Sequence, residues 1–324
     1  MRYVDLELNL DEIAKKPTRD GFGDGLVILG EENPDVVVTG VDVSSSLRVD
    51  WFRDKFPDRF INVGIAEQNE IGIAAGLSLA GKIPFAPGYG VFISGRTWDQ
   101  IRTTICYSNL NVKIGGGHGG ISVGPDGATH QALEEISIMR CLPNMRVIVP
   151  SDYNETKKAT LESAKIKGPV YIRFGREAVP SITNENTPFE IGKAYCMHKG
   201  TDVTLIACGI MVYECLVAAK ELEAEGISAM VINNHTVKPL DEETILEAAK
   251  TTGAFVTAEE HQIAGGMGSA VVEFLAQNYP IPVKMIGVRD RFGESGTFSE
   301  LMEEHQLTSK HIAKAAREAI KMKR

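Results

Sequence analysis

Short runs of β-branched and other apolar residues alternate with helical patterns along nearly the whole chain. Runs that are apolar at almost every position are typical of strands buried on both faces of a parallel sheet. They occur at Val36–Val38, Val147–Val149, Val170–Ile172, Val203–Ile206 and Met230–Ile232. The pattern therefore predicts an α/β fold built on parallel strands.

The segments between these runs carry signals for where helices begin and end. Asp152 is followed three residues later by Glu155, which is an N-terminal capping pattern. Gly226 and Gly253 stand where the following helices should stop. We therefore expect helices between the predicted strands, as a parallel sheet requires.

The residues from Pro180 to Pro188 form the best candidate for a linker. They read Pro-Ser-Ile-Thr-Asn-Glu-Asn-Thr-Pro, without periodicity and with many turn formers. A length of 324 residues also suggests two domains, because domains commonly contain about 150 residues. We predict domains at residues 1–187 and 188–324.

Acidic residues outnumber basic ones, 43 to 34, for a net charge of −9. This balance argues against binding to nucleic acid or to an anionic membrane, but permits a local basic pocket for a phosphorylated small molecule. No apolar run approaches the roughly 20 residues that span a bilayer. The N-terminus carries Asp5 and Glu7, where a signal peptide would be apolar. We predict a cytoplasmic protein.

The cysteines are scattered and form no CxxC pair, which favours a reducing compartment and argues against a zinc or iron–sulfur site. We expect all of them to be small buried apolar residues. They are Cys106, Cys141, Cys196, Cys208 and Cys215.

The segment from Arg59 to Gly81 predicts a strand, a turn and then a helix of small residues. Glu67 falls at the start of that helix, beside the apolar Ile65 and Ala66. A carboxylate there is stabilised as an anion by the helix N-terminus, or dry surroundings raise its pKa so that it shares a proton with a ligand. The alternative is an ordinary acid in the first turn of a helix.

A second segment, residues 115–131, is rich in glycine and contains His118, Asp126 and His130. The glycines allow tight turns and are expected to leave the imidazole of His118 accessible. Asp126 and His130 are expected to enter a helix that continues through Ile136. The segment lacks the i, i+4 ligand pair of a helical metal site. We therefore favour donors of hydrogen bonds to sugar hydroxyls or phosphate, and we predict no metal ligands on this chain.

Four motifs together resemble the C-terminal half of transketolase. They are Gly-Ile-Ala-Glu67-Gln, Pro84-Phe-Ala-Pro-Gly-Tyr89-Gly-Val-Phe92, Asp126-Gly-Ala-Thr-His130-Gln and Met139-Arg-Cys-Leu-Pro-Asn144. The likeness covers essentially the whole chain. It implies a parallel-sheet, pyrimidine-type thiamine-diphosphate-binding domain followed by a smaller α/β transketolase C-terminal domain.

The part of transketolase that grips the diphosphate and its metal is missing from this chain. Gly23-Asp-Gly25 has no asparagine at the required distance downstream. The chain therefore resembles the second subunit of a split enzyme, whose N-terminal partner subunit would hold most of the thiamine diphosphate contacts and the Mg²⁺ or Ca²⁺. The family also implies an assembly with two copies of each subunit.

The resemblance implies a role for Glu67 and two aromatic residues. Glu67 would hydrogen-bond the aminopyrimidine ring and favour its imino tautomer, whose nitrogen deprotonates the thiazolium carbon. Phe92 would stack on the pyrimidine, with Tyr89 beside it. A two-carbon ketol unit would then pass from a ketose phosphate to an aldose phosphate.

The resemblance also implies a set of residues that contact the sugar phosphates. His130 and Asp126 would bind substrate hydroxyls and stabilise charge near the reacting carbons, which makes His130 a second catalytic residue beside Glu67. The phosphate would be held by guanidinium, hydroxyl and imidazole groups, which are those of Arg19, Ser46, His118 and Arg176. Arg173 is an alternative to Arg176, and Ser44 or Ser45 to Ser46.

Three other classes of protein compete with this interpretation. The β-subunits of 2-oxoacid dehydrogenases have a similar length and a matching glutamate, but usually lack the Asp-Gly-x-Thr-His-Gln segment. Deoxyxylulose-phosphate synthase has that segment but is normally one long chain. A regulatory or binding subunit would be expected to lose Glu67 or the stacking aromatic residue, and both are present.

Overall fold

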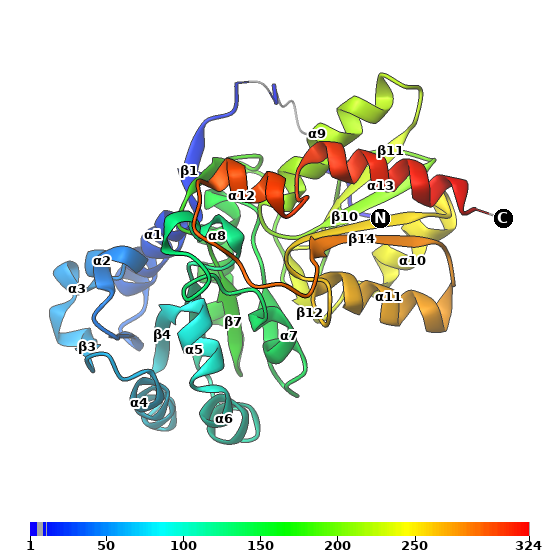
Figure 1. Ribbon diagram of the computed structural model, residues 1–324. Coiled ribbons are helices and arrows are strands. Elements are labelled where there is room, and N and C mark those ends of the chain that lie inside the picture. Colours follow the sequence, from blue (N-terminus) through cyan, green and yellow to red (C-terminus); the bar gives the residue numbers. More distant parts are fainter. Residues whose placement is uncertain (5–8, 11, 324) are drawn as a thin grey trace.

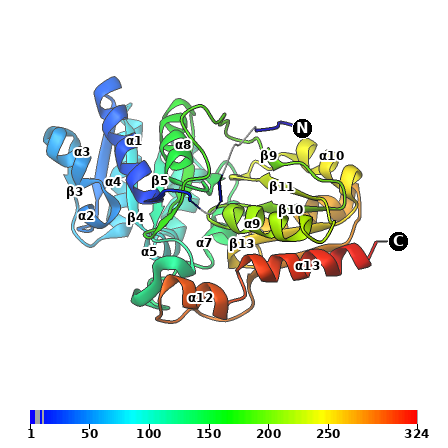
Figure 2. The same ribbon diagram turned by 90° about the horizontal axis from the view of Figure 1, so that it is seen from above.

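The computed structural model describes residues 1–4, 9–10 and 12–323. Asp5 and Glu7, on which the argument against a signal peptide depends, lie outside the described residues. In the described part of the chain, every helix is too short or too polar to cross a membrane. Figures 1 and 2 show the first half of the chain, in blue to green, beside the second half, in yellow to red.

The first half is built on a seven-stranded sheet with the order β12-β6-β7-β5-β4-β2-β3. All neighbours in it are parallel except β12 and β6. The strands are β2 (Val36–Gly40), β3 (Phe60–Asn62), β4 (Ile83–Tyr89), β5 (Lys113–Gly117), β6 (Arg146–Ile148), β7 (Val170–Arg173) and β12 (Thr236–Lys238).

Helices and a small antiparallel sheet surround this sheet. The helices are α1 (Thr18–Glu32), α2 (Ser44–Leu47), α3 (Asp50–Lys55), η1 (Pro57–Arg59), α4 (Glu67–Leu79), α5 (Gly90–Gly95), α6 (Trp98–Gln100), η2 (Ile101–Cys106), η3 (Ile121–Asp126), α7 (Glu135–Arg140) and α8 (Tyr153–Lys165). The small sheet pairs β1 (Lys15–Pro17) with β8 (Ala178–Pro180).

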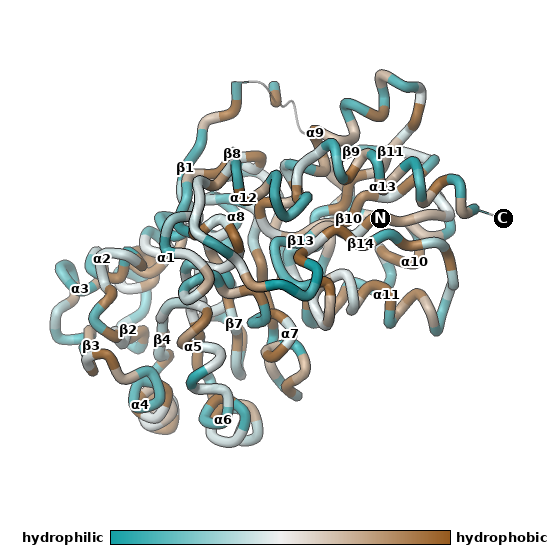
Figure 3. Tube along the Cα trace, in the orientation of Figure 1, coloured by the Kyte–Doolittle hydropathy of each residue, from teal (hydrophilic) through white to brown (hydrophobic). Residues whose placement is uncertain are grey.

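The core lies on both faces of the seven-stranded sheet, because successive side chains of a strand point to opposite faces. Phe85 of β4 joins the cluster formed with Phe22 of α1 and Ala159 of α8. Its neighbour Ala86 joins the cluster that contains Ile71 of α4. Burial on both faces explains why these strands are apolar at almost every position, and Figure 3 shows brown, hydrophobic stretches along strands in the interior.

The second half is built on a five-stranded sheet with the order β14-β13-β10-β11-β9, in which β9 alone is antiparallel to its neighbour. Helices α9 and α13 cover one face, and α10 and α11 cover the other (Figures 1 and 2). The elements are β9 (Tyr195–His198), β10 (Val203–Ala207), α9 (Met211–Glu223), β11 (Ala229–Asn233), α10 (Glu242–Thr252), β13 (Phe255–Gln262), α11 (Met267–Asn278), β14 (Val283–Val288), α12 (Phe298–Glu304) and α13 (Ser309–Lys321).

The α/β fold and the helix signals are confirmed. Each predicted apolar run overlaps a strand of the two sheets. Asp152 caps α8, because its carboxylate accepts a hydrogen bond from the backbone N–H of Glu155 at 2.9 Å. Gly253 follows α10 with φ +67°, in the left-handed region that favours glycine.

Two predictions of local structure are wrong. The helix expected from Asp126 to Ile136 does not form as one element, because η3 ends at Asp126 and α7 begins only at Glu135. Gly127, with φ +73°, breaks the chain direction between them. Cys141 is exposed after the end of α7, where its thiol donates to the carbonyl oxygen of Ile138, whereas the other cysteines are buried.

Segments of the two halves cross the predicted domain boundary at residues 187 and 188. The strand β12, from the second half, extends the first sheet by pairing with β6. Near the N-terminus, Tyr3 forms a bridge with Cys196 of β9. The boundary itself stays a prediction, and these exchanges tie the two sheets together.

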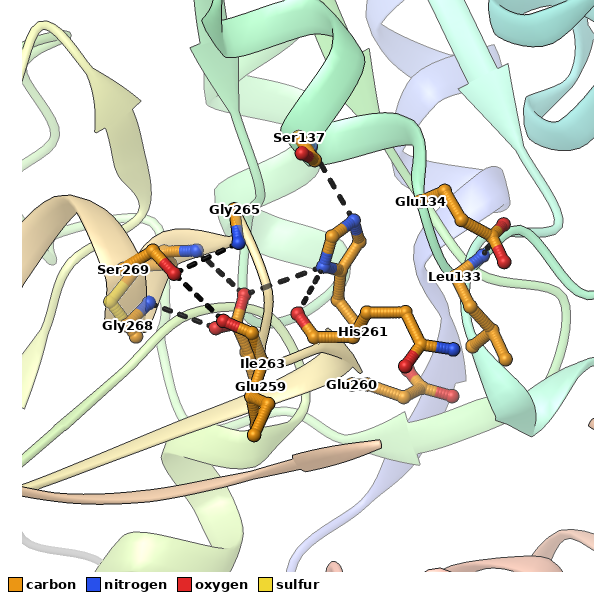
Figure 4. A network of polar contacts seen from close by, with 12 residues as sticks. Leu133, Glu134, Ser137, Glu259, Glu260, His261, Ile263, Gly265, Gly268 and Ser269 are labelled. Carbon is orange, nitrogen blue, oxygen red and sulfur yellow. Dashed lines mark hydrogen bonds and ion pairs between the residues drawn. The ribbon is translucent and has the colours of Figure 1, made fainter. Parts of the chain in front are cut away.

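A buried polar network also joins the two sheets, at the carboxyl end of β13. Glu259 accepts hydrogen bonds from the backbone N–H groups of Met267 and Gly268, at the start of α11. His261 lies between Ser137 of α7 and Glu259, as Figure 4 shows. Burial lowers the pKa of His261, so its imidazole is neutral and can occupy this interior.

Arg173, at the end of β7, supplies the cation of this network. It forms an ion pair with Glu135 and donates to the carbonyl oxygen of Glu260 at 2.7 Å. Burial alone lowers the pKa of Arg173, but the charges of Glu135 and Glu260 outweigh it and raise the pKa. Arg173 therefore compensates buried carboxylates between the sheets.

Replacing this arginine by an apolar side chain should strongly destabilise the fold. We expect Arg173→Met to lower the free energy of unfolding by about 3–5 kcal/mol, because it leaves buried carboxylates without a cation. Arg53→Met is the control, because Arg53 and Asp54 form an exposed pair that should contribute about 1 kcal/mol or less. Urea unfolding at pH 7 measures both, and similar small losses for the two variants would contradict this account.

Candidate active site

The predicted site residues lie mainly at one edge of the seven-stranded sheet. Parallel strands bring their carboxyl ends to the same edge, where ligands commonly bind in α/β folds. Ser46 follows β2, Glu67 follows β3, Tyr89 ends β4, His118 follows β5 and Arg176 follows β7. Residues that are far apart in the sequence therefore meet at this edge.

Glu67 is the first residue of α4 and is only 4 % exposed. The turn before it is tight, because Gly64 has φ +72° and its N–H donates to the side chain of Asn62. The carboxylate of Glu67 pairs with Arg96, with 2.9 Å between Glu67 Oε2 and Arg96 Nη1. The Arg96 side chain is 50 % exposed, so a solvent-accessible cation holds a buried anion.

Aromatic rings line the space next to this ion pair. The guanidinium of Arg96 lies over the ring of Phe92, 4.8 Å from its centre. The ring centres of Phe92 and Tyr89 are 6.3 Å apart. The imidazole of His130 meets both rings edge-on, at 5.4 Å from Phe92 and 5.8 Å from Tyr89. The site thus combines a carboxylate with the faces and edges of several rings.

His118 is 2 % exposed, so the expectation that glycines leave its imidazole accessible is wrong. Gly119 and Gly120 instead pack against Arg173 and Glu260, where a side chain would collide. His118 itself has φ +56°, an uncommon conformation for a residue with a side chain. Its ring lies 4.3 Å from that of Tyr89.

The electrostatic surroundings keep His118 neutral. Burial and the nearby charges of Arg19 and Arg176 lower the pKa of His118 to about 3, although Asp126 acts in the opposite direction. The buried Nδ1 atom has no hydrogen-bond partner among the described residues. The neutral imidazole of His118 can therefore form a hydrogen bond with a ligand.

Two cations approach His118 from different segments. The N–H of Gly175 donates to Thr18 Oγ1 at 2.7 Å, which holds the loop after β7 against the start of α1. This contact brings Arg176 near Arg19. Arg176 Nη1 lies 2.9 Å from Asp126 Oδ1, and its side chain is 33 % exposed.

Arg19 is half-buried and incompletely bonded. Its Nη1 donates to the backbone carbonyl of Ser46 at 3.0 Å, while its buried Nε has no partner in the described part of the chain. Burial and the charges of Arg48 and Arg176 lower the pKa of Arg19, although the charges of Asp20 and Glu177 oppose this shift; a net cost of holding the cation here remains. An oxyanion bound here would relieve that cost.

Arg173 and Arg176, the two alternatives for the phosphate contact, have different surroundings in the structure. Arg173 is buried in ion pairs with Glu135 and Glu260 and faces the second sheet. Arg176 is partly exposed beside Asp126 and acts on His118. Arg176 is therefore the more accessible of the two, and its contact with a ligand stays a prediction. Only the backbone of Ser46 takes part in a described contact with Arg19, so the choice among the three serines stays a prediction.

Arg96 is the residue that sequence reasoning missed. It lies 29 positions from Glu67, and no local spacing links the two. One signal could have found it. Arg96 is the C-cap residue of α5 and lies four residues after Phe92, and residues i and i+4 of a helix are neighbours.

The arrangement can bind two chemical groups at once. A buried carboxylate beside ring faces suits a flat heterocycle with a ring nitrogen. Arg19, Arg176 and neutral His118 suit a tetrahedral oxyanion. The described residues include no group of three His, Cys, Asp or Glu side chains that could hold a metal ion.

Comparison with known proteins identifies two family models that match the chain. Residues 14–181 match the transketolase pyrimidine binding domain, and residues 192–312 match the transketolase C-terminal domain.

Individual relatives match over nearly their whole length. The chain is 44 % identical to the 6-deoxy-6-sulfo-D-fructose transketolase subunit SqwH of Clostridium sp. (strain MSTE9), over 94 % of this chain and 95 % of that protein. It is 45 % identical to the putative transketolase C-terminal section of Methanocaldococcus jannaschii, over 94 % and 97 %. A solved structure, a split-gene transketolase described as an inactive β4 tetramer, is 47 % identical with a TM-score of 0.88, over 95 % and 99 %.

His118 should remain neutral throughout the physiological range of pH. Its pKa of about 3 lies far below the ordinary value of 6.5, so its ring nitrogens should not titrate between pH 5 and 8. Nitrogen-15 NMR of histidine-labelled protein measures this, and the His118→Gln variant assigns the signal. A His118 signal that titrates with a midpoint between pH 5 and 7 would contradict the burial and charge argument.

Proposed function

The chain belongs to the transketolase family, and from that premise we propose that it is the second subunit of a split transketolase that depends on thiamine diphosphate. Together with an N-terminal partner subunit it transfers a two-carbon ketol unit from a ketose phosphate to an aldose phosphate. The observation that carries the proposal is the buried carboxylate of Glu67 beside the ring of Phe92, with Arg96 in contact with both.

The residues at this place fit the aminopyrimidine of thiamine diphosphate. Glu67 offers an oxygen to a ring nitrogen, Phe92 offers a face for stacking, and Tyr89 lies beside it. When bound, the coenzyme supplies the nucleophilic carbon that takes up the ketol unit. Glu67 holds a proton at the ring nitrogen, as a general acid and base.

Arg96 keeps the carboxylate of Glu67 paired before a ligand binds. Removing a partner from a buried charge is costly, so Glu67 needs either this cation or a ring nitrogen that shares its proton. The Arg96 side chain is half-exposed and can turn toward solvent without losing its hydration. We propose that ligand binding exchanges one partner for the other.

The sugar phosphate occupies the part of the site that contains the cations. Arg19 and Arg176 hold the terminal oxyanion, and neutral His118 and Ser46 add hydrogen bonds. Asp126 and His130 bind the hydroxyl groups, and the imidazole of His130 meets the rings of both Tyr89 and Phe92. A sulfonate would satisfy the same cations, which is relevant because the Clostridium relative is named for a sulfonated sugar.

The diphosphate and its Mg²⁺ or Ca²⁺ would be held mainly by the partner subunit. The support is that the described residues offer no cluster of metal ligands, and that relatives of the same length are named as a subunit or a C-terminal section. We propose a cytoplasmic assembly of two copies of each chain.

The outer face of α4 supports contact with a further chain. Ile65, just before the helix, and Leu79, at its end, are 77 % and 75 % exposed. Between them, a side chain at Gly72 or Gly76 would meet no other atom within 4 Å. Exposed apolar residues around a smooth helical surface are typical of protein interfaces.

Removing the charge of Glu67 should abolish most of the activity without dispersing the complex. We expect Glu67→Gln in the reconstituted complex to lower ketol transfer by about 100-fold or more, because a proton can no longer be held at the ring nitrogen. Glu243→Gln, at an exposed acid in the first turn of α10, should retain normal turnover. Size-exclusion chromatography checks assembly, and near-normal turnover of Glu67→Gln would refute the assignment.

The isolated chain should bind the coenzyme poorly. Titration calorimetry with thiamine diphosphate and Mg²⁺ is expected to show tight binding only after the N-terminal partner subunit is added, because the diphosphate ligands come from that subunit. Tight binding by this chain alone would contradict the proposed division of the site.

A further inference from the structure

A second carboxyl group is buried directly behind Glu67. Glu70 lies three residues further along α4, so it occupies the same side of the helix. It is 0 % exposed, and its Oε2 atom has no hydrogen-bond partner among the described residues. Two neighbouring buried carboxyl groups cannot both be ionised without a large electrostatic cost. The question is which of them carries the charge.

Both hydrogen bonds of the Thr39 hydroxyl are satisfied if the carboxyl group of Glu70 is neutral. Thr39 Oγ1 lies 2.7 Å from Glu70 Oε1 and 3.2 Å from the carbonyl oxygen of Phe85. A hydroxyl has one proton, so Thr39 cannot donate to both oxygens. If Glu70 carries a proton, it donates to Thr39 Oγ1, and Thr39 donates to Phe85. Each short contact then contains one proton.

The charges around Glu67 and Glu70 also indicate that Glu70 is the neutral one. Arg96, from the end of α5, pairs with Glu67, while no cation forms an ion pair with Glu70 in the described part of the chain. From the neighbouring strands, the Thr39 hydroxyl of β2 contacts Glu70, and the Phe85 carbonyl of β4 contacts that hydroxyl. Burial raises the pKa of Glu70 to about 8; the hydrogen bond with Thr39 opposes this shift, and the charge of Glu67 adds to it.

We propose that Glu70 is a positioning residue for Glu67: it keeps a proton on its own carboxyl group, so that the pair carries a single negative charge and Glu67 holds it where the ligand binds. The inference rests on the proposed function, because the charge on Glu67 matters most if Glu67 exchanges a proton with a ring nitrogen.

The single charge has a consequence for Glu67. While Glu70 is neutral, Glu67 can gain and lose a proton without a second anion beside it. When Glu70 loses its proton at alkaline pH, a second negative charge appears one helical turn from the carboxyl group that meets the ligand. Glu67 then no longer exchanges a proton freely with the ring nitrogen of the ligand, so turnover should fall.

The first test measures the proton on Glu70 without using activity. The pKa of Glu70 lies at about 8 in the folded chain instead of its ordinary 4.5. The stability contributed by the neutral acid is therefore fully present below pH 4.5 and is lost as the pH rises through 8. The urea midpoint of the full chain should fall between about pH 5 and 8, where folded and unfolded Glu70 differ in bound protons, and Glu70→Gln should fall less steeply, because its amide does not titrate.

Two further variants make the stability test decisive. Glu242→Gln, at an exposed acid in the first turn of α10, should keep the wild-type slope. Glu70→Met provides a neutral side chain of similar length in case the amide folds poorly. If the midpoints of the wild type and of both Glu70 variants run parallel over this range, folded Glu70 binds no more protons than the unfolded chain does, so it is already ionised and the proposal is overturned.

The second test is the pH profile of kcat in the reconstituted complex. The wild type should lose turnover on an alkaline limb near pH 8. For Glu70→Gln this limb should move upward by about one pH unit or more, with kcat at pH 7 within about threefold of the wild type. A merely structural role would lower kcat equally at every pH, and that result, or an unchanged alkaline limb, would overturn the proposal.

The outcomes separate the two proposals. Loss of turnover in Glu67→Gln with an unchanged alkaline limb in Glu70→Gln contradicts only the role of Glu70. A complex without ketol transfer contradicts the proposed function, while the urea slopes still decide where the proton resides.

Discussion

A buried carboxylate must have a partner, and Glu67 has one that reaches it from the solvent side. The anion is 4 % exposed and its cation, Arg96, is half-exposed. Such a pair can be opened by a ligand that offers a hydrogen bond in place of the guanidinium, whereas a pair buried on both sides, such as Arg173 with Glu135, cannot. The candidate chemistry of the chain depends on this asymmetry.

The fold supports the pair by fixing its surroundings from both sides. The parallel sheet delivers Glu67, Tyr89, His118 and Arg176 to one edge. Behind that edge, the ion pairs of Arg173 with Glu135 and Glu260 connect the first half of the chain to the second. The glycines after His118 pack on this network, so they hold the imidazole in place beside Tyr89. Fold stability and site geometry are thus coupled through the same buried charges.

Much of this could be predicted from local patterns, and the rest required tertiary contacts. Apolar runs predict the strands because burial on both faces leaves no polar positions, and Asp152 predicts the start of α8 because its cap is local. The position of Glu67 at a helix start was likewise visible in the sequence. The partner Arg96, the burial of His118 and the break at Gly127 depend on segments that meet only in the folded chain. Arg173 and Arg176, three residues apart, have opposite environments for the same reason.

The central claim is that the carboxylate of Glu67 changes partner when an aminopyrimidine binds. The most direct measurement is an experimental structure of the complete two-subunit complex with thiamine diphosphate and Mg²⁺. The account predicts a pyrimidine ring on Phe92, with a ring nitrogen within hydrogen-bond distance of Glu67 and Arg96 turned away. A coenzyme ring placed elsewhere, with Glu67 still paired to Arg96, would contradict it.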